Sequence, residues 1–165
     1  MVSELSKRLL AIYLNDHLAA ATGGSQLAGR SAASNRGTRL GETLERVSAE
    51  IEQDRATLLR IMDALGVARD PAKVAAGWTA EKLGRLKLNG QLTGYSPLSR
   101  LIELEGLLLG ITGKLELWRS LSELGDRRLQ RFDFDDLIKR ADRQRRRISS
   151  QHKAAAAEAF AGESG

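Results

Sequence analysis

The chain of 165 residues contains no cysteine, only two histidines and only two prolines. Without cysteine it cannot carry a disulfide framework, a thiolate zinc site or a cysteine nucleophile. Two histidines are too few for a histidine-rich metal cage, and the scarcity of proline favours long uninterrupted helices. No apolar run approaches the roughly 18 residues of a membrane span, so we expect no membrane contact, and we expect no signal peptide. These absences favour a cytoplasmic, nearly all-helical protein.

The charged residues are unevenly distributed. Lysine and arginine number 26 against 21 aspartates and glutamates, a net charge of +5. Ten of the basic residues and five of the acidic ones lie within 126–153, so this segment carries the whole excess. Such a segment can bind nucleic acid, here through Arg143, Arg146 and Arg147. We favour the alternative of a solvated helix face that carries i,i+4 pairs such as Asp136 with Arg140.

Apolar residues recur every three or four positions along most of the chain, as in amphipathic helices. This spacing predicts four long helices over 3–33, 40–65, 96–124 and 134–160, and a shorter helix over 71–88. The connections between the first two and the last two long helices are short, which predicts two antiparallel hairpins. A connection of some 30 residues between the second and third long helices is long enough for a crossover. We expect one domain over 1–161 and a frayed tail over 162–165.

Particular residues mark the helix ends and the buried faces. Thr38 and Ser96 are predicted N-caps, and Gly66 is predicted to end the second helix in a left-handed conformation. The predicted buried face of the first helix comprises Leu5, Leu9, Ile12, Asp16, Ala20, Gly24 and Leu27. That of the second comprises Leu40, Leu44, Val47, Ile51, Asp54, Leu58, Ile61 and Leu65. That of the last comprises Phe134, Leu137, Ala141, Gln144, Ile148, His152, Ala155 and Ala159.

Two further features bear on packing. In the third long helix, Gly106, Gly110 and Gly113 fall at spacings of four and three, and each glycine costs roughly 1 kcal/mol in a helix interior. We expect them to allow close approach, either to a helix of the same chain or to a second copy across a two-fold axis. Trp78, on the short helix, is expected to cover the bundle as a lid.

Four segments resemble a known family: LNDHLAA at 14–20, EIEQ at 50–53, LGRLKLNG at 83–90 and LIELEG at 101–106. They are similar to motifs of bacterioferritins, and the chain also looks like the ferritin-like stress-response bundles of bacteria. The resemblance covers about residues 9–106, and the fourth helix matches poorly. It implies a ferritin-like, left-handed four-helix bundle in which a long crossover with a short extra helix joins helices 2 and 3.

The family's di-iron site takes a glutamate from each of two helices and a Glu-x-x-His pair from each of the other two. By the resemblance, the single glutamates of the first and third helices fall on His17 and Glu103. The Glu-x-x-His pair of the second helix falls on Glu50 and Gln53. The pair of the fourth helix falls on Ala141 and Gln144, or, in an alternative register, on Asp133 and Asp136. Too few carboxylates remain to neutralise two iron ions, so no intact di-iron centre is expected. A single iron or other divalent metal held by His17, Glu50 and Glu103 is one alternative. We favour a buried polar layer that joins these residues to Gln53 and Gln144 and holds no metal cofactor.

Three functions fit these observations. The first, which we favour, is a non-catalytic interaction or stress-associated protein, a homodimer able to bind a further protein partner. The second is an atypical metal-binding, iron-handling oxidase that uses His17, Glu50 and Glu103. The third is a DNA-binding bundle that uses the basic fourth helix.

Overall fold

The computed structural model describes residues 4–73, 75 and 94–161. All regular structure within these ranges is helical, which confirms the predicted all-α class. The elements are α1 (Glu4–Ser34), α2 (Arg39–Leu65), α4 (Pro97–Ser122), the 3-10 helix η1 (Arg127–Leu129) and α5 (Phe134–Phe160). Residues 71–73 and 75 are also helical, as predicted for the start of the short helix. The rest of that helix, including Trp78, and the tail over 162–165 lie outside the described residues.

Side-chain caps determine where the long helices begin and end. The Thr38 hydroxyl accepts a hydrogen bond from the Gly41 amide at 3.0 Å, and the Ser96 hydroxyl accepts one from the Ser99 amide at 3.0 Å. Gly66 ends α2 with φ = 70°, a left-handed conformation that favours glycine. These three predicted caps are therefore confirmed. Asp133 caps α5 in the same way, since its carboxylate accepts from the Asp136 amide at 2.9 Å.

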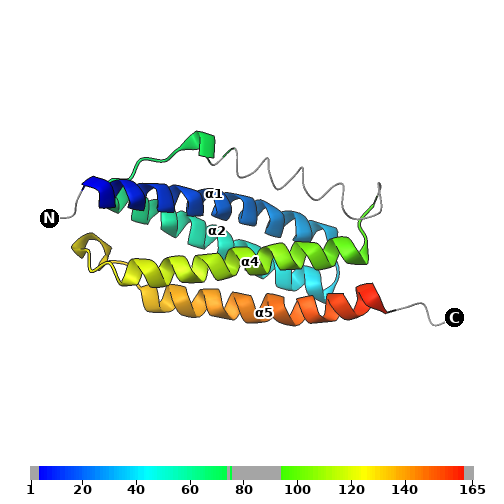
Figure 1. The fold of residues 1–165 in the computed structure, drawn as a ribbon. Coiled ribbons are helices and arrows are strands. Elements are labelled where there is room, and N and C mark those ends of the chain that lie inside the picture. The colour runs from blue at the N-terminus through cyan, green and yellow to red at the C-terminus, as the bar shows by residue number, and fades with distance from the viewer. Residues whose placement is uncertain (1–3, 74, 76–93, 162–165) are drawn as a thin grey trace.

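The four long helices lie side by side (Figure 1). α1 and α2 form one antiparallel hairpin and α4 and α5 form another, as the short connections predict. α2 ends and α4 begins at opposite ends of the molecule, so these two helices run in the same direction. α1 packs against α2 and α4, and α5 packs against the same two helices. α2 and α4 are thus diagonally opposite each other across the core.

The core consists of two apolar clusters at different heights in the bundle. The cluster near the N-terminal end of α1 includes Leu14, Leu18, Leu58, Ile61, Met62, Leu115, Trp118, Leu121, Leu137 and Ala141. The other cluster includes Leu27, Leu44, Val47, Ile51, Leu101, Leu104, Leu107, Ile111 and Ile148. On α2, α4 and α5 the position between the clusters is polar, and it is occupied by Asp54, Lys114 and Gln144. A polar layer therefore separates the two halves of the core.

The predicted buried faces agree with the structure for two helices and disagree for α1. Residues of the α2 stripe from Leu44 to Leu65 are buried, as are five residues of the α5 stripe, Leu137, Ala141, Gln144, Ile148 and Ala155. On α1, however, Leu5 and Leu9 are 65% and 57% exposed, and the buried leucines are Leu14, Leu18 and Leu27. The prediction for α1 was right for Leu27 and wrong for Leu5 and Leu9. This helix carries apolar residues on two faces, so spacing alone does not choose between them.

Gly110 and Gly113 of α4 do not have the packing role predicted within the chain. A Cβ atom added to Gly110 or Gly113 would meet nothing within 4 Å. Neither residue is therefore needed for close approach of another described helix.

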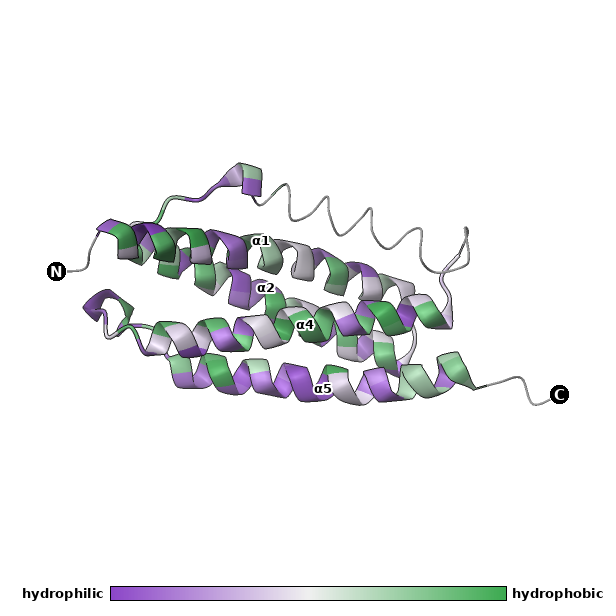
Figure 2. Cartoon of the chain, in the orientation of Figure 1, coloured by the Kyte–Doolittle hydropathy of each residue, from purple (hydrophilic) through white to green (hydrophobic). Residues whose placement is uncertain are grey.

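Along α5 the hydropathy is strongly polar in the middle, where the arginines gather (Figure 2). Among the described helices, none combines the length and apolar character that a membrane crossing requires.

Gly41 is a glycine that the packing requires. A Cβ atom there would overlap the carbonyl group of Asn35, at the turn between α1 and α2. We expect Gly41→Ala to lower the free energy of unfolding by about 1–3 kcal/mol, as overpacking does. Urea denaturation followed by circular dichroism measures the change.

Gly110→Ala is the matched control, because it adds the same methyl group to a helix position with open space. It should raise the free energy of unfolding by about 0.5–1 kcal/mol through the better helix propensity of alanine. Equal losses in the two variants would contradict the packing at Gly41.

Candidate functional site

Asp54 of α2 is the centre of the polar layer, and its side chain is 1% exposed. Its Oδ1 atom accepts hydrogen bonds from Nε of Arg140, at 2.9 Å, and from Nη2 of the same residue. Its Oδ2 atom accepts from Nζ of Lys114 at 2.6 Å and from Nε2 of Gln144 at 3.1 Å. One buried carboxylate therefore binds side chains from both α4 and α5.

Gln144 is fully buried and completes the layer. Its Nε2 donates to Asp54, and its Oε1 accepts from Nζ of Lys114. The amide therefore has its nitrogen on the carboxylate and its oxygen on the ammonium group, so both ends are satisfied. Buried polar groups paired in this way avoid the penalty of an unmet donor or acceptor.

The layer holds more positive than negative charge. Lys114 and Arg140 supply two cations, and Asp54 supplies one anion, which leaves a formal excess of +1. Burial lowers the pKa of Lys114 below its ordinary value, and the neighbouring Asp54 carboxylate offsets part of this effect. This excess positive charge attracts a further anion to this part of the bundle.

Glu50 lies one turn before Asp54 at the edge of the layer. Its Oε1 accepts from Nη1 of Arg147 at 2.9 Å, while its Oε2 is buried and has no hydrogen-bond partner among the described residues. Its charge also favours the ammonium form of Lys114. Glu50 thus adds a second carboxylate nearby, but it brings a third cation, Arg147, with it.

The structure does not bring the predicted metal ligands together. Among the described residues there is no group of three or more histidine, aspartate and glutamate side chains that could hold a metal ion. Glu103 is engaged elsewhere, with Nε of Arg30 at 3.4 Å and the Tyr95 hydroxyl at 3.1 Å. The grouping of His17, Glu50 and Glu103 was therefore wrong as a single ligand set.

Helix geometry explains this outcome. Glu103 precedes Lys114 by 11 residues, about 16 Å along the axis of α4, whereas Glu50 precedes Asp54 by four residues, about 6 Å along α2. Since Lys114 and Asp54 are in contact and the two helices are parallel, Glu50 and Glu103 are staggered by about 10 Å.

The predicted polar layer is correct only in part. Gln144 belongs to it, and His17 borders it, because His17, Asp54 and Lys114 line one cavity of about 40 Å³. A polar cavity of this size has room for a water molecule. Gln53 is exposed instead, since the adjacent residue Asp54 takes the buried position. Asp54 and Lys114 were missing from the predicted layer. Each is a charged residue within an apolar stripe, and this pattern is the signal that could have identified them.

His17 is half-buried and lies edge-on to the Tyr13 ring, with 4.6 Å between ring centroids. Burial lowers its pKa below 6.5, and the nearby Asp16 carboxylate opposes this shift. The imidazole is therefore held in its neutral form more strongly than in an unfolded chain.

The arginines predicted to contact nucleic acid are partly neutralised. Arg146 pairs with Asp142 at 2.7 Å and Arg147 pairs with Glu50, whereas Arg143 is exposed. Arg145 also binds Asp142, at 2.8 Å. The two contacts with Asp142 agree with the solvated helix face that the sequence favours. The expected pair of Asp136 with Arg140 is wrong, because Arg140 binds Asp54 of α2 instead. No family model, curated protein or solved structure matches this chain, so its function is inferred from these contacts.

We expect Asp54→Asn to lower the free energy of unfolding by about 3–5 kcal/mol, because it leaves Lys114 and Arg140 buried without a carboxylate. Lys114→Met is the matched variant. It keeps the pair of Asp54 with Arg140 but leaves the Oε1 atom of Gln144 without its hydrogen-bond donor. The free energy of unfolding should therefore fall by about 1–3 kcal/mol. Urea denaturation of both variants tests this order, and a smaller loss in Asp54→Asn than in Lys114→Met would refute it.

Acid should destabilise the protein through His17. Below its ordinary pKa of 6.5 the unfolded chain binds a proton at this residue, while the folded chain, with its lowered pKa, resists protonation. The unfolded state therefore gains protons first, and stability falls as the pH falls from 7 towards 5.

The difference in unfolding free energy between the wild type and His17→Gln, measured across this pH range, should decrease towards acid pH. The control variant His152→Gln keeps His17, so its free energy of unfolding should fall towards acid pH as that of the wild type does. Parallel stability curves for the wild type and His17→Gln would argue against a lowered pKa.

Proposed function

We propose that this protein is a ferritin-like bundle in which an ion-pair layer stands in place of a metal centre, and that it acts as a non-catalytic interaction or stress-associated protein. The helix directions support this proposal. α1 and α5 run one way, and α2 and α4 run the other way, as a crossover between the two hairpins requires (Figure 1).

The single observation that carries the proposal is the charge of the central layer. A di-iron centre needs several carboxylates to neutralise its cations. Here both oxygens of Asp54 already accept hydrogen bonds from cations, and the layer with Lys114 and Arg140 has a net positive charge. An incoming metal ion would meet like charges, so these residues do not fit the metal group that the resemblance implies.

An interaction role has support on the outer surface. Leu5, Leu9 and Ile12 are exposed on α1 at spacings of four and three, so they form one apolar stripe. Self-association along this stripe would bury it in the homodimer that we expect. The DNA-binding alternative has less support, since Arg146 and Arg147 already bind carboxylates.

The metal content of the protein, purified without chelator or nickel, tests this proposal. We expect no stoichiometric metal and no binding or oxidation in an anaerobic iron(II) titration followed by admission of air. Lys114→Glu is the informative variant, because it exchanges a cation for a second carboxylate in the layer and should raise metal affinity if the variant folds. Stoichiometric iron in the wild type, lost in Glu50→Ala and Glu103→Ala, would overturn the proposal in favour of an iron-handling protein.

A further inference from the structure

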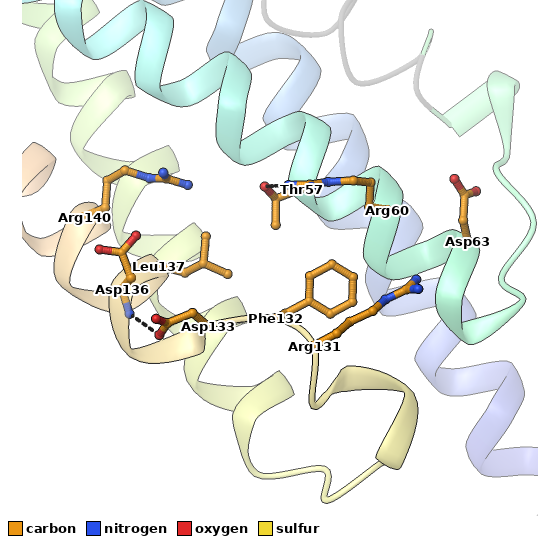
Figure 3. Close-up of a pocket in the computed structure, with 9 residues that line it drawn as sticks. All are labelled: Thr57, Arg60, Asp63, Arg131, Phe132, Asp133, Asp136, Leu137 and Arg140. Atoms are coloured by element: carbon orange, nitrogen blue, oxygen red, sulfur yellow. Dashed lines mark hydrogen bonds between the residues drawn. The ribbon is translucent and has the colours of Figure 1, made fainter.

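A second feature, separate from the central layer, is a pocket of about 560 Å³ at the end of the bundle where α5 begins. Its walls come from α2, from the segment 131–133 and from the first two turns of α5 (Figure 3). This volume lies in the range of small-molecule sites. The lining combines three arginines and three aspartates with Thr57, Phe132 and Leu137.

Two of the three aspartates are already engaged. Both carboxylate oxygens of Asp63 accept from Nη2 of Arg69, at 2.8 and 3.0 Å. The carboxylate of Asp133 caps α5 by accepting from the Asp136 amide. The third, Asp136, is exposed at the mouth. The charge of Asp63 is therefore neutralised by Arg69, while Asp133 and Asp136 keep their charges at the start of α5.

Two of the three arginines are available. Arg60 donates from Nη2 to the Thr57 hydroxyl at 2.9 Å, and Arg131 lies over the Phe132 ring, 5.1 Å from its centroid. Neither has a carboxylate partner among the described residues. The third, Arg140, directs Nε and Nη2 to Asp54, which leaves Nη1 for another acceptor. Figure 3 shows the guanidinium groups of Arg60 and Arg140 approaching Thr57 from opposite sides.

The charge of the neighbouring layer acts in the same direction. Arg140 belongs both to the pocket and to the layer around Asp54, which carries a formal excess of one positive charge. An anion placed beside Arg140 would compensate this excess. The Phe132 ring and Leu137 provide an apolar surface next to the arginines.

We propose that this pocket binds a small organic anion, a phosphate or carboxylate attached to an apolar or aromatic group. Arg60, Arg131 and the free edge of Arg140 bind the anionic group, and Phe132 and Leu137 contact the apolar part. The site shares Arg140 with the central layer, whereas Arg60, Arg131, Phe132 and Leu137 lie outside that layer.

Three probes separate the contribution of the anionic group from that of the ring. Phenyl phosphate carries both a ring and an anion, inorganic phosphate carries the anion alone, and benzylamine carries a ring with a cation. Titration of the full chain, followed by NMR shifts of Thr57 and Phe132, should give the tightest binding for phenyl phosphate and none for benzylamine. Added salt should weaken the binding.

The variants Arg60→Gln and Arg131→Gln should each weaken phenyl phosphate binding about tenfold, as the loss of a charge-assisted hydrogen bond does. Both residues are exposed, so the fold should survive, and thermal unfolding of each variant verifies this. Arg146→Gln removes an exposed arginine outside the pocket and should leave the affinity unchanged. Tighter binding of benzylamine, an equal loss in Arg146→Gln, or shifts from none of the probes would overturn the proposal.

Discussion

The contact on which the rest of this structure depends is the hydrogen bond between Asp54 and Lys114, 2.6 Å long, which joins two helices that lie diagonally across the bundle. Through Arg140 and Gln144 the same carboxylate also holds α5. A buried ion pair adds little net stability, because desolvation of its charges opposes their attraction. Its effect here is on register. A shift of one turn in α2, α4 or α5 would leave at least one buried charge without its partner.

The division of the core follows from this contact. Apolar packing alone specifies the alignment less strictly, since a core of given volume can be filled by different sets of hydrophobic side chains. The polar layer admits one alignment, in which Asp54, Lys114 and Gln144 meet. The two apolar clusters thus supply most of the stabilisation, and the layer aligns α2, α4 and α5 with one another. Arg140 extends this layer outwards, where it becomes one wall of the pocket at the start of α5.

Much of the fold could be predicted from the sequence, because its signals are local. The caps at Thr38 and Ser96 and the left-handed Gly66 act within one turn, and the stripes of α2 and α5 are properties of single helices. The buried face of α1 could not be chosen, because Leu5 and Leu14 belong to two apolar faces of the same helix. For the site, the sequence identified Gln144 and placed Asp54 on the buried stripe. It did not pair Asp54 with Lys114, since that contact depends on the axial position of one helix relative to another, which no spacing within a single helix encodes.

A double-mutant cycle between Asp54 and Lys114 tests most directly whether this contact organises the core. The free energies of unfolding of the wild type, Asp54→Asn, Lys114→Met and the double variant give the coupling energy of the pair. If the two side chains are in contact inside the bundle, the double variant will be more stable than the sum of the single losses predicts, by about 1–3 kcal/mol. Losses that add to within about 0.5 kcal/mol would show that the two residues do not interact, and would contradict the alignment of α2 with α4 described above.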